Sequence, residues 1–204
     1  MELIYGTTNK AKIEFMKKRL EPLDIEILSL SDVNAPKLEI DESGDTPLEN
    51  ARIKALAYYR ELRKPVFSCD SGLFIDGLDA ARQPGAHVRS VGGQELNDEE
   101  TIDYFSALAR ELGGSMTARY QNAICLVLDE ARVFEHMGED IASERFLIVS
   151  KPHGKRNEGF PIDSLSVHIG SGKYYYDMDD QSKKLAEGND GFAAFFGRVF
   201  SEKH

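Results

Sequence analysis

The sequence predicts an α/β protein built around a mixed sheet. Apolar strand-like runs alternate with amphipathic segments of helical period up to about residue 113. Strand-like segments then follow one another between about 117 and 150, and one more apolar helical face, at 192–199, closes the chain. Alternating strands and helices are typical of parallel pairing, and consecutive strands joined by short links favour antiparallel pairing. We therefore expect both kinds of pairing.

Capping motifs predict where two of the helices begin. Thr46 supplies a capping hydroxyl, Pro47 stands at the first helical position and Glu49 at the third. Asn97 and Glu100 form a second capping box. The predicted elements are, in chain order, strand 3–5, helix 13–20, strand 25–28, helix 47–62, strand 65–69, helix 97–113, strands 117–129, 131–138 and 143–150, and helix 192–199.

Length, charge and cysteine content limit the class of protein. We expect residues 1–204 to form one domain, which is long enough to bury a core. The net charge of −10 argues against a general nucleic-acid or membrane-surface binder, but local lysines and a divalent cation can still bind a polyphosphate. Cys69 and Cys125 lie in apolar runs, as buried reduced thiols do. Neither a leader nor an apolar span is evident, so we expect a cytoplasmic protein.

The loop after the first strand, GTTNKAK at 6–12, has the composition of an anion site. A strand that enters a helix through small polar residues presents backbone N–H groups and the positive end of the helix dipole. Thr7, Thr8 and Asn9 add donors, and two lysines add charge. The glycine spacing of a Walker P-loop is absent. An ordinary strand-to-helix turn, capped by Thr8 or Asn9, is the alternative.

Four acids precede the second helix: Glu39, Asp41, Glu42 and Asp45. Carboxylates stabilise a helix N-terminus, which is one sufficient explanation. The other is that one of them binds Mg²⁺, a hard ion that prefers carboxylate and phosphate oxygens. Lys54 follows Asn50 by four residues, so both lie on one helix face and could look into the same cleft.

The segment PVFSCDSGLFIDGL, residues 65–78, raises the question why an apolar strand should end on a carboxylate. Open α/β sheets place ligand-binding groups at the carboxyl ends of strands, which is where Asp70 would stand. There it could bind a metal or activate water, and Ser71 and Gly72 would let backbone amides approach a phosphate oxygen. An Asx-type turn is the alternative. Together the three segments form a coherent set for Mg²⁺-dependent phosphate chemistry.

Three segments, TTNKAK, ESGDTPLENARIKA and CDSGLFIDGL…QPGAHVRSVGG, resemble in order and spacing those of the inosine triphosphate pyrophosphatase family. The resemblance covers the first 93 residues. It implies an elongated two-lobed mixed-sheet α/β fold with a central nucleotide-binding cleft, a β-meander lobe at roughly 117–170, and a homodimer. It also implies hydrolysis of a nucleoside triphosphate to a nucleoside monophosphate and pyrophosphate, the family's substrates being ITP, dITP and XTP.

The resemblance further implies roles for individual residues. Asp70, Lys12 and Lys54 would be catalytic, with Asp70 the base for the attacking water. Mg²⁺ would be the cofactor, bound by Glu42 and Asp70. The residues that would bind the substrate are Thr7, Thr8, Asn9, Lys12, Lys54, Ser71, Gly72, Phe160, Asp163 and Lys184.

The sequence departs from the family in three places. Cys69 stands where the family has an acid. Of the family's Gly-Phe-Gly-Tyr-Asp-Pro segment the chain keeps Phe160 and Asp163, but Ile162 replaces the second aromatic residue. Lys184 is kept, whereas Asn189-Asp190 replaces a His-Arg pair that reads the 6-oxo edge of the purine. A carboxylate there favours an N–H donor on the ligand, so base specificity is expected to shift.

The sequence therefore predicts a Mg²⁺-dependent nucleoside triphosphate pyrophosphatase, a house-cleaning enzyme for non-standard purines with altered base specificity. The alternative is a nucleotide-binding or regulatory protein of the same fold with little or no turnover. Cys69 favours that alternative, and the retained acids and lysines disfavour it. The expected partner is a nucleoside triphosphate, with no nucleic acid and no membrane.

Overall fold

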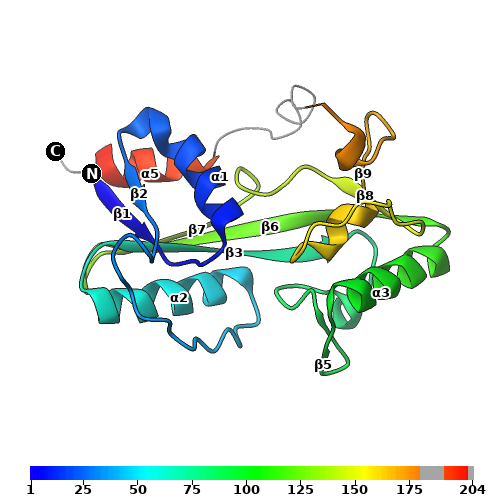
Figure 1. The fold of residues 1–204 in the computed structure, drawn as a ribbon, viewed down its shortest axis with the longest axis horizontal. Helices are drawn as coiled ribbons and strands as arrows, with labels where there is room; N and C mark the ends of the chain where they lie inside the picture. Colours follow the sequence, from blue (N-terminus) through cyan, green and yellow to red (C-terminus); the bar gives the residue numbers. More distant parts are fainter. Residues whose placement is uncertain (180–190, 202–204) are drawn as a thin grey trace. The chain divides into compact units, whose positions relative to one another are not determined.

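The structure is a computed structural model that describes residues 1–179 and 191–201 (Figure 1). The chain divides into two compact units. The first unit consists of Met1–Ser71, Gln121–Ala142 and Asn189–His204, and the second of Gly72–Tyr120 and Ser143–Gly188. The boundaries fall inside two long strands, β3 (Val66–Ile75) and β6 (Ser115–Val127), so each of these strands contributes residues to both units.

The first unit contains both parallel and antiparallel strand pairs. Strand β1 (Glu2–Tyr5) pairs in parallel with β2 (Glu26–Leu28) on one side and with β3 on the other. Strand β6 pairs antiparallel with β7 (Val133–Met137) and is also a neighbour of β3. The sheet is therefore mixed, which confirms the predicted fold class.

Helices cover both faces of this sheet. Helices α1 (Lys10–Leu20) and α5 (Gly191–Ser201) lie on one face, and α2 (Pro47–Leu62) lies on the other (Figure 1). Odd-numbered side chains such as Tyr5, Phe67 and Cys69 belong to the core under α1 and α5. Even-numbered ones such as Ile4 and Val66 pack with Tyr58 of α2. Since side chains alternate along a strand, Asp70 falls on the α2 face.

The second unit has its own core beneath α3 (Asp98–Glu111). Strand β8 (Phe146–Val149) pairs antiparallel with β6 and with β9 (Ser166–His168). A 3-10 turn, η3 (Pro161–Leu165), places Ile162 and Leu165 in this core.

The other short elements among the described residues of the two units are η1 (Glu21–Leu23), η2 (Ala80–Arg82), η4 (Tyr175–Asp177), β4 (Ser90–Val91) and β5 (Gln94–Glu95).

Both predicted capping boxes are present. The Thr46 hydroxyl accepts a hydrogen bond from the Glu49 backbone, and the Glu49 carboxylate accepts one from the Thr46 backbone. Asn97 and Glu100 form the same pair of bonds at the start of α3. Reciprocal bonds of this kind satisfy backbone donors that a helix start otherwise leaves free, which explains why both helices begin where their sequence predicts.

The predicted end of the third strand is wrong. The strand was expected to end at residue 69, but β3 continues through Asp70 and Ser71 to Ile75. Backbone pairing decides this: β3 has β6 as a second neighbour, and Leu73 exchanges backbone hydrogen bonds with Gly85. Polar side chains do not end a strand whose backbone groups remain paired, so the alternative of an Asx-type turn is also wrong.

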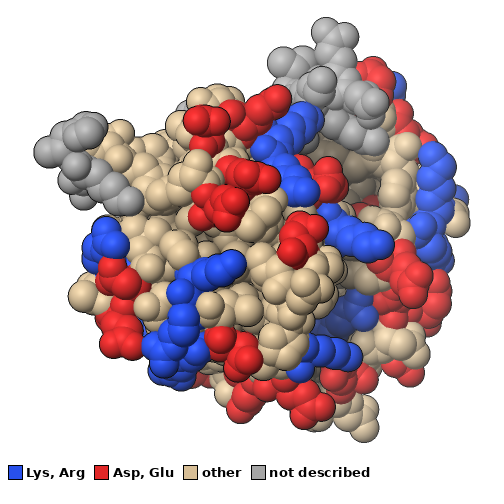
Figure 2. Space-filling view, turned by 60° about the vertical axis from the view of Figure 1, so that its left-hand side comes forward, with Lys and Arg blue, Asp and Glu red and all other residues tan. Residues whose placement is uncertain are grey.

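Charged side chains of both signs are interspersed on the face shown in Figure 2. That face has no continuous basic surface of the kind a nucleic-acid backbone requires. Within the described residues, no helix is long and apolar enough to cross a membrane. The expectation that residues 1–204 form one domain stays a prediction.

Candidate active site

Two carboxylates and one lysine converge in the first unit. Lys54 Nζ lies 2.7 Å from Glu42 Oε2 and 3.1 Å from Asp70 Oδ1. The side chains of Lys54 and Asp70 are each only 13% exposed, whereas that of Glu42 is 47% exposed. The structure therefore brings together three of the residues that the sequence singled out, from a helix, a strand and the irregular segment before the helix.

The local fold explains why these three side chains meet. Asp70 points toward α2 because it is an even-numbered residue of β3, like Val66. Lys54 lies two turns into α2, on the same side of the helix as Asn50 and Tyr58, which are both buried. Glu42 comes from residues 35–44, which form neither helix nor strand.

The charges of this cluster stabilise one another. Burial alone would lower the pKa of Lys54, but the carboxylates of Asp70 and Glu42 outweigh burial, so the pKa of Lys54 lies above its ordinary value. The ammonium group is therefore charged at neutral pH. One carboxylate oxygen of Glu42 and one of Asp70 thus already contact the same positive charge. A divalent cation would use the same pair of carboxylates.

The two carboxylates could hold a divalent metal ion. Among residues 1–179 and 191–201, no group of three or more His, Cys, Asp or Glu side chains is placed to hold a metal ion. Mg²⁺ is commonly bound through one or two carboxylates, with substrate phosphates and water as its other ligands. Glu42 and Asp70 meet that requirement. Glu39 and Asp41 are exposed, and a share for them in metal binding stays open.

The loop between β1 and α1 has the geometry of a capped helix start. The side chain of Asn9 is the N-cap and accepts a hydrogen bond from the Lys12 backbone at 3.1 Å. The Thr7 hydroxyl accepts one from the Asn9 backbone at 3.2 Å. Thr8 is exposed and Lys12 is half-buried. Asn9 rather than Thr8 is thus the cap, and its role in the fold is compatible with an anion at the same helix end.

Asn122 is a residue of this region that sequence reasoning missed. Its amide oxygen accepts a hydrogen bond from the Ser71 hydroxyl at 2.7 Å, and its amide nitrogen donates to the Ile141 carbonyl at 2.7 Å. Ser71 and Asn122 come from the neighbouring strands β3 and β6. No motif marks Asn122 in the sequence, because its position beside Ser71 depends on strand register. Gly72, which follows Ser71 in β3, is buried.

Cys69 faces away from the acid–lysine cluster. Its side chain is 7% exposed and belongs to the core under α1 and α5. Burial raises the pKa of its thiol to about 12, and the hydroxyl of Tyr5 hydrogen-bonds to the sulfur. The residue that replaces an acid of the family is therefore a neutral core side chain.

Phe160 and Asp163 lie in the second unit, at the turn η3. Phe160 is half-buried and immediately precedes the turn. Asn157 Nδ2 donates to Asp163 Oδ2 at 3.0 Å. Burial raises the pKa of Asp163 despite this hydrogen bond. Ile162 is 2% exposed in the core, so it does not replace the family's second aromatic residue as a stacking surface. Lys184 and Asn189-Asp190 lie outside the described residues.

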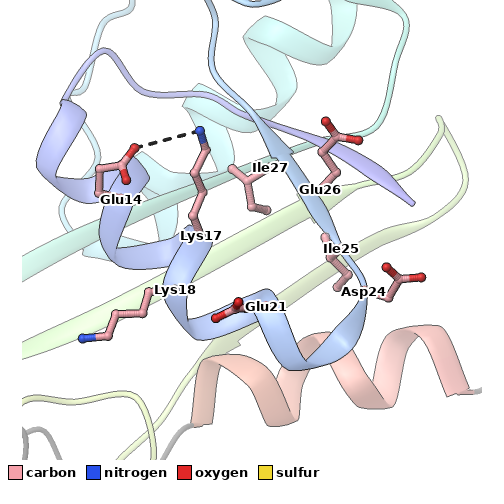
Figure 3. Close-up of a pocket in the computed structure, with 8 residues that line it drawn as sticks. All are labelled: Glu14, Lys17, Lys18, Glu21, Asp24, Ile25, Glu26 and Ile27. Carbon is pink, nitrogen blue, oxygen red and sulfur yellow. Dashed lines mark ion pairs between the residues drawn. The ribbon is translucent and has the colours of Figure 1, made fainter.

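A shallow hollow between α1 and β2 has a different character (Figure 3). Its volume is about 560 Å³, and none of the predicted site residues lines it. Six of its eight lining side chains are charged, four acidic and two basic: Glu14, Lys17, Lys18, Glu21, Asp24 and Glu26. Glu14 and Lys17 pair only loosely, at 3.9 Å. The hollow is a solvated charged surface, and the acid–lysine cluster is the better candidate site.

Comparison with known proteins identifies the family. The model of the Ham1 family matches residues 3–187, which is most of the chain. The chain belongs to the Ham1 family. A dITP/XTP pyrophosphatase of Bacillus subtilis is 33% identical over 193 residues, which is 91% of this chain and 85% of that protein. One of Halalkalibacterium halodurans is 33% identical over 174 residues, covering 82% and 84% of the two chains.

Solved structures agree on the fold of this Ham1-family chain. A HAM1 protein from Coxiella burnetii matches with a TM-score of 0.74 and 24% identity, covering 99% of each chain. The Staphylococcus aureus Ham1 protein matches with a TM-score of 0.70 and 22% identity, covering 99% of this chain and 98% of that one. The family and the mixed α/β fold identified from the sequence are thereby confirmed.

Proposed function

We propose that this Ham1-family protein is a nucleoside triphosphate pyrophosphatase that acts on non-standard purine nucleotides and releases pyrophosphate. The observation that carries the proposal is the convergence of Glu42, Lys54 and Asp70. Family membership supports it, because the similar proteins of Bacillus subtilis and Halalkalibacterium halodurans are dITP/XTP pyrophosphatases. A binding protein without turnover is not favoured, because the similar proteins are named as pyrophosphatases.

Each residue of the cluster has a distinct task in this proposal. Asp70 would accept the proton of the attacking water while the α–β phosphoanhydride bond breaks and pyrophosphate leaves. Lys54 would stabilise the negative charge that develops on the phosphate oxygens. Lys12 and the backbone N–H groups at the start of α1 would bind the triphosphate. Ser71, oriented by Asn122, and Gly72 would contact phosphate oxygens.

Glu42 and Asp70 would hold Mg²⁺, which when bound neutralises phosphate charge and orients the phosphate chain. The proposal includes a homodimer, which the resemblance to the family implies, and a cytoplasmic location, which is an expectation from the sequence. It also includes contact of Phe160 and Asp163 with the base and of Lys184 with the nucleotide. With Asn189-Asp190 in place of His-Arg, the base preference is expected to differ from ITP and XTP or to be broader.

The test is pyrophosphate release with Mg²⁺ across ITP, dITP, XTP, the standard nucleotides and several modified ones, with the products separated by chromatography. Release of monophosphate and pyrophosphate from a non-standard purine nucleotide is the expected result. Efficient release from standard nucleotides alone would overturn the substrate class while leaving the phosphate chemistry intact. A nucleotide that raises the melting temperature but is never hydrolysed would overturn the enzymatic proposal in favour of a binding protein.

A further inference from the structure

The segment that carries Glu42 is held by apolar packing only ahead of Glu42, where Ala35, Leu38 and Ile40 pack on the cluster that contains Tyr58. Residues 35–44 form neither helix nor strand, so no backbone ladder sets their position. The Glu42 side chain is 47% exposed, and its ion pair with Lys54 is partly open to solvent. Ion pairs of this kind are screened by salt and hold geometry weakly. Because the apolar packing ends at Ile40, a further contact after Glu42 is needed to fix that side chain as a ligand.

Asn50 provides that contact. Its side chain is buried, at 2% exposure, and its Oδ1 accepts a hydrogen bond from the Gly44 backbone at 2.8 Å. A β-carbon at Gly44 would lie 2.7 Å from both Asn50 Oδ1 and Glu49 Cβ, so only glycine allows this approach. The segment therefore contacts the first turn of α2 at Gly44, which lies two residues after Glu42.

The same face of α2 thus makes two polar contacts of different kinds with the segment. Lys54 contacts Glu42 itself, through charges that a metal ion and a polyphosphate would redistribute. Asn50 lies one turn earlier and accepts a hydrogen bond from the Gly44 backbone, a neutral interaction that salt does not screen. The Asn50 contact can persist while the charges around Glu42 change.

We propose that Asn50 is a positioning residue, which holds Glu42 where the divalent cation binds without touching cation or substrate. The inference rests on the proposed role of Glu42 as a metal ligand. Removal of the Asn50 side chain would leave the half-buried N–H of Gly44 without its acceptor and free the stretch after Ile40 to move. Metal affinity would fall, whereas the chemical step would be unchanged once metal is bound.

The experiment is a Mn²⁺ titration of the nucleotide-free protein, followed by the free ion's electron paramagnetic resonance signal, for wild type, Asn50→Ala and Asn50→Asp. We expect Asn50→Ala to weaken Mn²⁺ binding by about tenfold or more, the equivalent of one hydrogen bond. Asn50→Asp keeps the acceptor and should bind Mn²⁺ at least as tightly as wild type. The half-saturating Mg²⁺ concentration for pyrophosphate release should rise in Asn50→Ala, with kcat at saturating Mg²⁺ nearly unchanged.

Two further variants make the result decisive. Gly44→Ala disturbs the same contact from the other side and should also weaken Mn²⁺ binding, so it carries the test if Asn50→Ala does not fold. Asn97→Ala is the matched control: it deletes the same kind of side chain-to-backbone bond at the start of α3, in the second unit. It should lower the melting temperature without changing Mn²⁺ affinity.

The outcomes separate this inference from the proposed function. If Glu42→Gln weakens Mn²⁺ binding but folded Asn50→Ala and Gly44→Ala bind like wild type, the positioning role is overturned and the metal site stands. If Glu42→Gln binds Mn²⁺ like wild type, the ligand role of Glu42 fails and the inference fails with it. Weakened binding in Asn97→Ala would mean that any loss of stability lowers metal affinity, which would also overturn it.

Discussion

The acid–lysine cluster of the first unit favours the charged form of its lysine, whereas the turn around Asp163 in the second unit disfavours the charged form of its carboxyl group. Both contain a group whose pKa is raised. For Lys54 the raised pKa means that the charged form is favoured, because Asp70 and Glu42 outweigh burial. For Asp163 it means that the charged form is disfavoured, because burial outweighs the hydrogen bond from Asn157.

Under the proposed function, this difference suits a division between phosphate binding and base recognition. A region whose charges are already compensated suits a metal ion and a phosphate chain, which every nucleoside triphosphate brings. A region that penalises charge suits the neutral edge of a base, where hydrogen bonds and stacking discriminate among ligands. Changes in the first unit should therefore lower turnover for all substrates alike, and changes at Phe160 or Asp163 should alter their ranking.

The largest effect is expected for Asp70→Asn. Without the carboxylate, the metal loses a ligand and the water loses its base, so pyrophosphate release should fall by about a thousandfold or more for every nucleotide. The amide can still accept a hydrogen bond from Lys54, so the melting temperature should change by only a few degrees. Turnover near the wild-type level in this variant would contradict the role of Asp70.

A smaller effect that differs among substrates is expected for Phe160→Ala. Stacking of a base on an aromatic ring contributes about 1–3 kcal/mol, so KM should rise by about tenfold while kcat changes little. Steady-state kinetics with two purine nucleotides and one pyrimidine nucleotide would show whether the loss depends on the base. Equal loss of kcat for all three would mean that Phe160 does not take part in discrimination.

Asp163→Asn should affect stability in a pH-dependent way. A carboxyl group whose folded-state pKa is raised imposes no penalty below its ordinary value of 3.8, where it is protonated in both states. As the pH rises from that value to the folded-state pKa, the unfolded chain gives up its proton before the folded protein does, so the folded state loses stability. The variant should therefore melt a few degrees above wild type at pH 8, and the gain should shrink toward pH 4.

Thermal melts of Asp163→Asn and wild type at several pH values test this directly. Asn157→Ala is the matched comparison, because it removes the donor to Asp163 and should make the penalty at pH 8 larger. A difference between Asp163→Asn and wild type that is constant from pH 4 to pH 8 would show that the charge of Asp163 plays no part in it.

The sequence predicted the elements of the first unit well, because their signals are local. The capping box at Thr46 and Glu49 involves residues three apart, and the face shared by Asn50 and Lys54 follows from helical period alone. The end of β3 could not be predicted in this way. Asp70 and Ser71 look like the end of a strand, yet pairing with a strand some fifty residues later continues it.

The contacts made by Asn50 and Asn122 show the same limit. That Asn50 lies on the face of Lys54 was predictable, but its bond to Gly44 depends on how an irregular segment turns back onto α2. Asn122 meets Ser71 through strand register, which no local pattern in either strand encodes. The base-reading residues beyond Asp163 rest on resemblance alone, since 184 and 189–190 lie outside the described part of the chain.

The smallest effect is expected for Cys69→Ala, which tests whether the missing acid of the family matters. Burial raises the pKa of its thiol to about 12, which favours the neutral form at neutral pH. Its side chain faces the core that contains Tyr5 and Phe67, whereas Asp70 faces α2. Turnover should therefore stay within about twofold of wild type, while a small cavity and an unpartnered Tyr5 hydroxyl lower the melting temperature by about 2–4 °C. A tenfold loss of kcat at unchanged stability would instead place Cys69 in the reaction, and the carboxylates on the α2 face would then be an incomplete account of the site.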